Sequence, residues 1–146
     1  MTEKTLIENV DGKDGFYITE NLVSTIPATA GNYGVIFTAL HPCTVMMVAE
    51  SHTVAGSDAG AVTLNLEKLT TGQALDAGVE VITTSFSLKS TANTPVIKQG
   101  YNEINPTNSV LKQGDRLALK DAGVLTAVAG VQVTIYCKRN GKGDYR

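Results

Sequence analysis

The sequence predicts an all-β protein: a single jelly-roll-like β-sandwich with an extended N-terminal arm. Short runs in which apolar and polar residues alternate are separated by turn signals, and no helical segments alternate with them as in a βαβ protein. At 146 residues the chain has the size of one domain, and with 42% apolar but only 5% aromatic residues its core is built mainly from aliphatic side chains. An immunoglobulin-like sandwich is the second choice, and the absence of Trp counts against it.

The first thirty residues are less regular than the rest, and we divide the chain into segments 1–30, 31–138 and 139–146. Segment 1–30 is either an extended arm with one apolar side or a pair of ordinary edge strands, and both alternatives stay open. Segment 31–138 is the sandwich, and 139–146 is a polar, Gly-rich tail that we expect to be flexible. The candidate partner-contacting side chains of the first segment are its apolar ones, Leu6, Ile7, Phe16, Ile18, Leu22 and Ile26.

Strands are expected where alternation is clearest. Residues 61–69 alternate Leu64 and Leu66 with Asn65 and Glu67, which predicts a strand with one apolar face and one face in water. The last strand, 131–138, has an equally regular inner face. Further strands are expected over 33–40, 44–50, 96–98 and 115–120.

The residues show no recognisable catalytic motif. Only two histidines are present, and His52 shares a strand face with Glu50. With Cys43 nearby in sequence these two residues could form a zinc site only if all three converged, because zinc needs three or four convergent ligands at defined geometry, and we disfavour this hypothesis. No nucleophile elbow, phosphate-binding loop or dinucleotide fingerprint is present, so we expect no enzyme activity, no cofactor and no metal. A small all-β enzyme of the cupin type is the least favoured hypothesis.

Charge and hydropathy exclude two partner classes. The net charge is −2 and no basic cluster carries interleaved aromatic residues, so we expect no nucleic acid. No apolar run approaches the roughly 20 residues of a membrane helix. Residues 1–8 lack the features of a secretory signal, so we expect a protein made and kept in a cytoplasm. There, Cys43 and Cys137 are expected to be reduced and buried, with a disulfide as the alternative.

Three blocks of sequence carry a resemblance to a known group of proteins. Residues 86–94 (FSLKSTANT), 111–119 (LKQGDRLAL) and 125–134 (LTAVAGVQVT) lie within a region, 33–138, that resembles small structural proteins of tailed bacteriophages. The similarity is to head decoration (cement) proteins and related head-fibre modules. It implies a jelly-roll-like domain, usually a homotrimer, on the outside of an icosahedral head.

The resemblance implies a function as well as a fold. The leading hypothesis is a virion structural protein, made in the host cytoplasm, that binds the capsid exterior and stabilises it by bridging subunits of the major capsid protein. The alternative is a carbohydrate- or receptor-binding module of a virion fibre or tail. That alternative predicts exposed aromatic residues in loops, for which Tyr101 and Tyr33 are the candidates.

Overall fold

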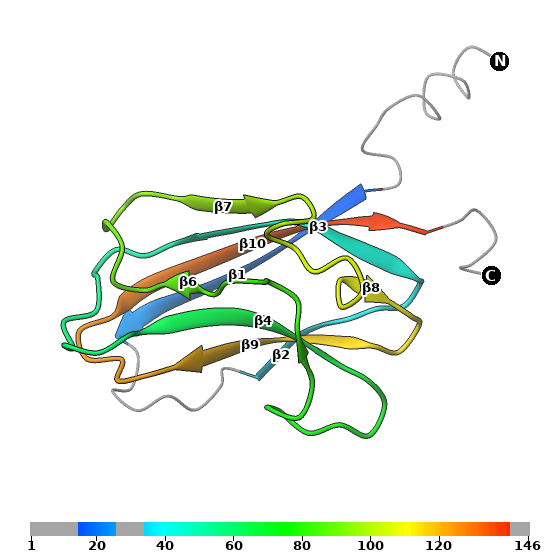
Figure 1. Ribbon diagram of the computed structural model, residues 1–146, viewed down its shortest axis with the longest axis horizontal. Helices are drawn as coiled ribbons and strands as arrows, with labels where there is room; N and C mark the ends of the chain where they lie inside the picture. The colour runs from blue at the N-terminus through cyan, green and yellow to red at the C-terminus, as the bar shows by residue number, and fades with distance from the viewer. Residues whose placement is uncertain (1–14, 26–33, 141–146) are drawn as a thin grey trace, which may run out of the picture.

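The computed structural model describes residues 15–25 and 34–140, with side chains described for 15–22 and 34–140. Within these ranges, ten strands form two antiparallel sheets that pack face to face (Figure 1). The described residues contain no helix, and hence none that could cross a membrane. The predicted all-β sandwich is confirmed.

The first sheet has the strand order β1-β10-β3-β7. Its members are β1 (Gly15–Thr25), β10 (Ala129–Arg139), β3 (Cys43–Ser51) and β7 (Val96–Gln99). A short strand, β8 (Val110–Leu111), pairs with the first two residues of β3, where β7 does not reach. The edge beside β3 is therefore made by two short strands in succession.

The second sheet has the order β2-β9-β4-β5. It contains β2 (Gly34–Thr38), β9 (Arg116–Ala122), β4 (Thr63–Leu69) and β5 (Val79–Glu80). The short β6 (Phe86–Ser87) pairs with β4 next to β5, so this sheet also ends in an interrupted strand.

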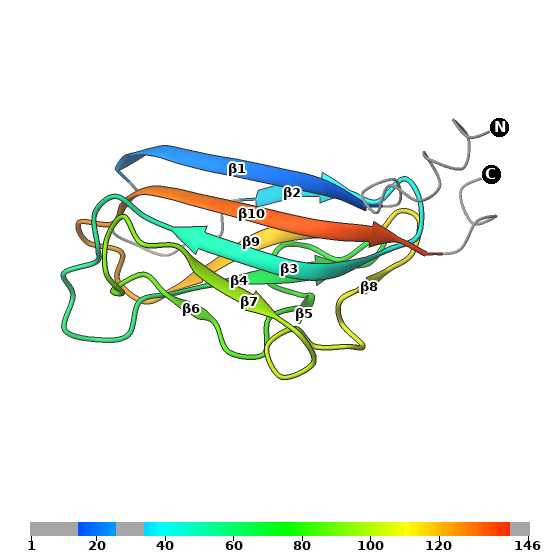
Figure 2. The ribbon, with the colours of Figure 1, turned by 90° about the horizontal axis from the view of Figure 1, so that it is seen from above.

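The strand order is that of a jelly roll. The first strand lies beside the last, the second lies beside the last but one, and the chain crosses between the sheets as it winds inward. β5 and β6 both pair with β4 and together count as one interrupted strand, and β7 and β8 do the same beside β3. With these two pairs each counted once, the chain has the eight strands of a jelly roll. Figure 2 shows β1 and β2 on the same side of the sandwich, each at the edge of its own sheet.

The core lies between the sheets and is made by alternate residues of the central strands. On β10, Val131, Val133, Ile135 and Cys137 are buried, as their alternation predicts. Large side chains from the other elements fill the remaining space, namely Leu64, Leu66, Ile82, Phe86, Leu88, Leu111, Leu117, Leu119 and Leu125.

The prediction of a wet face on residues 61–69 is wrong. Asn65 and Glu67 point away from the core, yet they are only 3% and 1% exposed. The chain between β4 and β6 covers this face, and the two polar side chains hold it there. Asn65 Oδ1 accepts from the amides of Leu66 and Ile82, and Asn65 Nδ2 donates to the oxygen of Ile82 and to Ser85 Oγ. An alternating pattern identifies the two faces but not what covers them.

Residues 15–25 form an edge strand of the sandwich itself. β1 pairs with β10 over its length, with an irregularity between Leu22 and Thr25. The stretch 15–25 is thus paired as an edge strand, whereas the two alternatives for residues 1–30 as a whole stay open. Residues 1–14 and 26–33 lie outside the described residues.

Candidate interaction surface

The outward face of the first sheet carries no charged side chain across three successive rows of cross-strand neighbours. One row joins Tyr17, Tyr136, Met47 and Gln99 across β1, β10, β3 and β7. Two more rows follow along the strands. We call this surface the neutral face; it comprises Tyr17, Thr19, Asn21, Met47, Ala49, Ser51, Ile97, Gln99, Gln132, Thr134 and Tyr136.

Side chains of the neutral face contact each other across the strands. The rings of Tyr17 and Tyr136 lie 5.0 Å apart between centroids. Gln132 Nε2 donates to Asn21 Oδ1 at 2.7 Å. Such contacts restrict rotamers before any partner binds, which reduces the entropy lost on binding.

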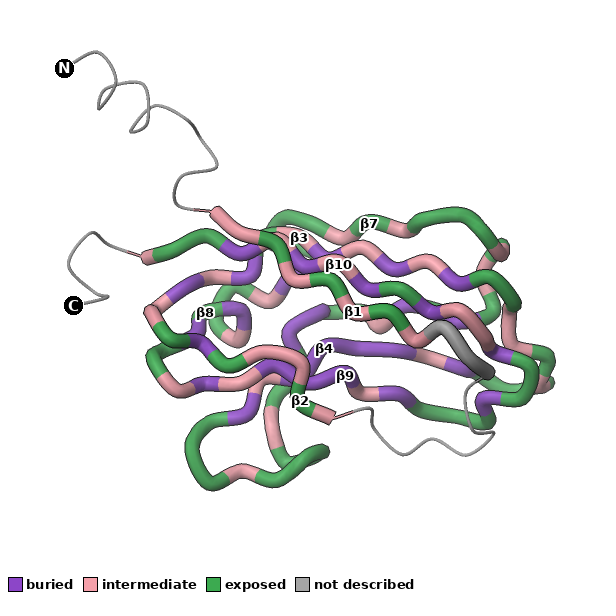
Figure 3. The backbone as a smooth tube through the Cα atoms, turned by 180° about the vertical axis from the view of Figure 1, so that it is seen from behind, coloured by how far each residue is buried: buried purple, intermediate pink, exposed green. Residues whose placement is uncertain are grey.

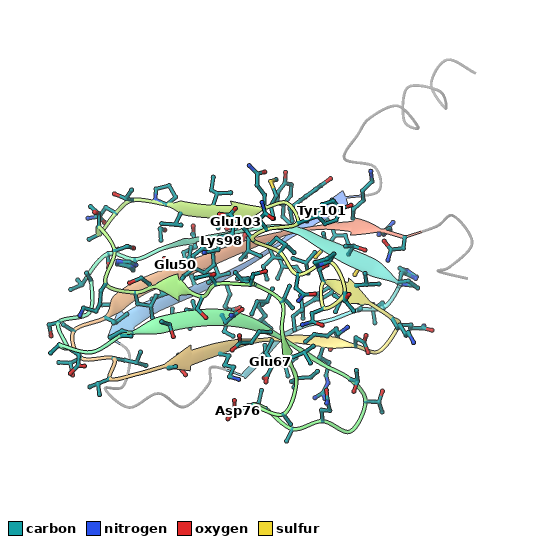
Figure 4. All side chains as sticks on the ribbon, in the orientation of Figure 1. Glu50, Glu67, Asp76, Lys98, Tyr101 and Glu103 are labelled. Carbon is teal, nitrogen blue, oxygen red and sulfur yellow. The ribbon has the colours of Figure 1, made fainter. Side chains whose placement is uncertain are left out.

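The outward face of the second sheet is different in kind. The loop between β4 and β5 lies on it and is held by charged groups. Glu67 accepts from the amides of Asp76 and Gly78 at 3.0 and 3.1 Å. Arg116 donates to backbone oxygens of the same loop, and Lys120 Nζ lies 2.9 Å from Asp76 Oδ1. Figure 4 labels Glu67 and Asp76 at this loop. The second sheet is thus covered, whereas three rows on the outward face of the first sheet are exposed or half-buried and carry no charge; the next row contains Lys138.

A shallow groove continues the neutral face toward β8. It has a volume of about 390 Å³ and is lined by Thr44, Val45, Met46, Gly100, Tyr101, Ile104, Pro106 and Ser109. Met46 adjoins Met47 of the neutral face, and Tyr101 at the opposite wall is 84% exposed. Met and Tyr are residue types enriched in protein interfaces. The groove is large enough to take an apolar side chain of a partner.

A buried acid–base pair lies between the sheets. Glu50 and His52 share the inward face of β3, as predicted, and His52 Nδ1 lies 2.9 Å from Glu50 Oε1. His52 Nε2 lies 2.9 Å from the oxygen of Ser90, which can only accept, so Nε2 carries a hydrogen. Burial raises the pKa of the Glu50 carboxyl, and the hydrogen bond from His52 offsets part of that rise.

The surroundings of this pair do not resemble an active site. Neither Glu50 nor His52 lines the groove at Tyr101 or the second large cavity, at Phe16 and Phe37. Within the described ranges, no three His, Cys, Asp or Glu side chains gather as a metal ion would require. Together with Asn93, whose amide donates to the oxygen of His52, the pair fastens the loop after β6 to the end of β3.

The two cysteines are free and buried, as predicted. They lie on the inward face of the neighbouring strands β3 and β10, two residues apart in the pairing, because Cys137 is opposite Val45 and Cys43 is opposite Arg139. The hydrogen bond with Cys43, together with burial, raises the pKa of the Cys137 thiol far above its usual range, so that it stays protonated.

The predicted contact residues fall into two groups. Phe16, Ile18 and Leu22 are partly buried against the core of their own domain, on the opposite side of β1 from the neutral face. Leu6, Ile7 and Ile26 lie outside the described residues, and their contact with a partner stays a prediction. We did not predict the outward-facing residues of β1, which are Tyr17, Thr19 and Asn21. Each of them follows an inward-facing residue in a strand with a period of two, and this position could have indicated them.

Comparison with solved structures finds chains of viral particles. A chain of the cyanophage Pam1 capsid asymmetric unit is 13% identical, with a TM-score of 0.46, over 86% of this chain and 84% of that one. A chain of infectious bursal disease virus strain Gx is 12% identical, with a TM-score of 0.34, over 88% of this chain but only 33% of that one. No protein-family model matches, and no curated protein is similar in sequence. Likenesses this weak carry no functional argument.

Proposed function

We propose that this chain is a virion structural protein of the decoration (cement) type, which binds the outside of a phage capsid and stabilises it by bridging subunits of the major capsid protein. The observation that carries the proposal is the neutral face, an open sheet surface without charge on a jelly-roll domain. The sequence blocks that resemble phage decoration proteins lie within the same domain.

The neutral face has the physical character of a protein-binding surface. Interface cores are depleted in charge and enriched in Tyr and Met, because burying an unpaired charge is costly and burying an aromatic ring is favourable. Thr, Ser, Asn and Gln side chains supply hydrogen bonds at the smaller desolvation cost of neutral groups. The groove beside Tyr101 adds an apolar recess at the margin of the face.

We also propose that the chain acts mechanically, without catalysis and without a cofactor. In support, its buried acid–base pair is enclosed between the sheets and already has a structural partner in the loop after β6. A sandwich that resists shear between bound subunits suits a bridging role.

A binding experiment with one charge substitution tests the proposal. Thr134 lies on β10 in the middle of the neutral face, so T134E places a carboxylate where a bound capsid subunit would bury it. T84E is the matched control, because Thr84 is exposed in the loop between β5 and β6 of the other sheet. Purified chain is sedimented with expanded empty heads of a tailed phage that encodes it. We expect saturable binding by wild type and T84E, weakened at least ~10-fold in T134E. No binding by wild type would overturn the function, and equal binding by T134E would remove the neutral face from it.

One observation favours a second candidate, a carbohydrate-binding module. Tyr101 is 84% exposed beside the groove, which is the position of an aromatic platform for a sugar ring. The other predicted aromatic, Tyr33, lies outside the described residues. A glycan array on which wild type binds and Y101A does not would favour this function, whereas an array without hits would reject it.

A further inference from the structure

Among the described residues, the outer edge of β1 has no strand paired with it. β1 is the outermost strand of its sheet (Figure 2) and, within the described residues, pairs only with β10. It runs for 11 residues and contains no Pro, Lys or Arg; its protective features are the inward-facing Glu20 and the irregularity after Leu22, and residues 15–19 carry neither. Soluble proteins usually protect such an edge with charge, Pro, bulges or a covering segment, because its free amides and carbonyls are a template for another strand.

The inward residues of β1 are also incompletely covered. Figure 3 shows β1 alternating between exposed and half-buried residues, whereas β3 and β10 alternate with fully buried ones. On the adjacent edge, formed by β2 and the turn after it, Val35 and Leu40 are 42% and 70% exposed. A recess of about 350 Å³ lies here, with Phe16 and Phe37 in its lining. We call this side, formed by β1 and β2, the open rim.

The rim on the other side of the sandwich, formed by β6 and β7, is covered by a charged side chain. There Lys98 of β7 lies over the ring of Phe86 of β6, with Nζ 5.4 Å from the ring centroid, so a side chain of one sheet covers the other. On the open rim, Phe16 and Phe37 also meet across the sheets, at 5.6 Å between centroids, but Leu40 beside them remains exposed. Apolar surface and unpaired backbone therefore coincide on one side of the molecule.

We propose that this rim binds a second copy of the chain, with β1 pairing antiparallel to β1 of the partner across a twofold axis at Thr19. A twofold axis is the commonest symmetry of a homo-oligomer, and it joins identical edges. The two first sheets then become one continuous sheet, which carries the neutral faces of both copies side by side.

Charge and side-chain size select this register. An axis at Glu20 would oppose two carboxylates directly, which is unfavourable. An axis at Thr19 instead places Phe16 opposite Leu22 of the partner subunit and Tyr17 opposite Asn21 of the partner subunit, and it places Ile18 opposite Glu20 of the partner subunit. It uses the regular part of β1, before the irregularity that follows Leu22. An axis at Ile18 would instead oppose Glu20 to the larger apolar side chain of Phe16, so the Thr19 axis sets the carboxylate against the smaller of the two apolar side chains.

The area available is sufficient for a stable pair. A rim as long as an 11-residue strand, roughly 37 Å, and two sheets deep can bury ~700 Å² per copy, close to the roughly 800 Å² per partner of standard interfaces. The apolar part of that area includes the exposed side of Leu40 and the half-buried side chains of β1.

Cysteine substitution tests the register. T19C places two thiols on the axis, where directly opposed Cα atoms of an antiparallel pair lie about 4.5–5.5 Å apart, within reach of a disulfide. The control N21C lies on the same face of the same strand, but the two copies of residue 21 would be about 13 Å apart along the strand, beyond that reach. Because Cys43 and Cys137 are buried, they do not compete. We expect T19C, and not N21C, to form a covalent dimer on oxidation.

Light scattering of the full-length wild-type chain tests the stoichiometry. A dimer is expected, with T19E weakening association at least ~10-fold and T84E leaving it unchanged. A monomer or a trimer in wild type would overturn the proposal, as would cross-linking through N21C. The trimer is what the resemblance to decoration proteins implies, so the measurement separates the two arrangements. Binding to the capsid is measured separately with T134E. Failure of the dimer proposal and failure of the proposed function can therefore be told apart.

Discussion

Glu50 Oε1 and His52 Nδ1 lie 2.9 Å apart, with both side chains wholly removed from solvent between the two sheets. Their cross-strand neighbours include Val133 of β10 and Val96 of β7, so the pair stands in an apolar environment. The raised pKa of Glu50 makes the free energy of unfolding depend on pH, and replacing Glu50 changes that free energy.

The first prediction concerns the pH dependence of stability. The pKa of Glu50 is raised above its ordinary value of 4.5, so the folded state holds the proton more tightly than the unfolded state. The stabilisation from this group is therefore complete below pH 4.5 and is lost as the pH rises through the raised value. In E50Q this contribution is absent. Urea unfolding from pH 4 to 8 should show a smaller decline in E50Q than in wild type, and identical slopes would contradict the raised pKa.

Substituting the same residue also tests the hydrogen bond. E50Q keeps a donor for His52 Nδ1, whereas E50A leaves that buried nitrogen unpaired. We expect E50A to lower the free energy of unfolding at pH 7 by about 1–3 kcal/mol more than E50Q does. Equal losses in urea unfolding would show that the contact contributes nothing.

The second prediction concerns the loop that covers β4. Glu67 accepts from two amides, and its removal leaves both without this partner. E67A should lose about 2–3 kcal/mol, and E67Q, whose amide nitrogen cannot accept, should lose less because one of its atoms still accepts. Hydrogen exchange at the amides of Asp76 and Gly78 should accelerate in the same order. Unchanged exchange in E67A would mean that other contacts hold the loop.

The third prediction compares two glycines with the same backbone conformation. Gly72 and Gly123 have φ of 86° and 94°, so an alanine is strained at either position. A Cβ at Gly72 would meet nothing within 4 Å, whereas one at Gly123 would lie 2.1 Å from the oxygen of Ala61. Because the conformational strain is common to both, G123A should be less stable than G72A by about 1–3 kcal/mol. Similar melting curves for the two variants would contradict the packing of this loop.

The fourth prediction concerns the thiols. Cys43 and Cys137 are free and buried, so in protein purified without reductant both should react with an aromatic disulfide reagent after unfolding in guanidinium and neither in the native state. Detection of no thiol after unfolding would show that the pair forms a disulfide.

The sequence allowed the inward faces of the strands to be predicted, because each strand of a sandwich buries every second residue. Val131, Val133 and Ile135 are buried as their alternation indicated, as are Leu117 and Leu119. The sharing of one face by Glu50 and His52 followed from the same period of two.

The outward faces could not be assigned in this way. Asn65 and Glu67 have the same pattern as the exposed Gln132, yet a loop covers them. That loop is held by contacts between residues 9 and 17 positions apart in sequence, which a pattern does not reveal. The neutral face could not be predicted from the sequence, because its rows cross β1, β10, β3 and β7. These strands are far apart in the sequence and are neighbours only in the strand order of the folded sheet.

The central claim, that the chain reinforces a shell, is tested most directly by the stability of decorated heads. Expanded empty heads are heated with saturating wild-type chain, with T134E and with no addition, and disruption is followed by light scattering. Bridging between subunits predicts that the disruption temperature rises by several degrees with wild type and stays at the undecorated value with T134E, because a ligand that binds only the intact shell stabilises it. Disruption of fully decorated heads at the same temperature as bare heads would contradict the claim.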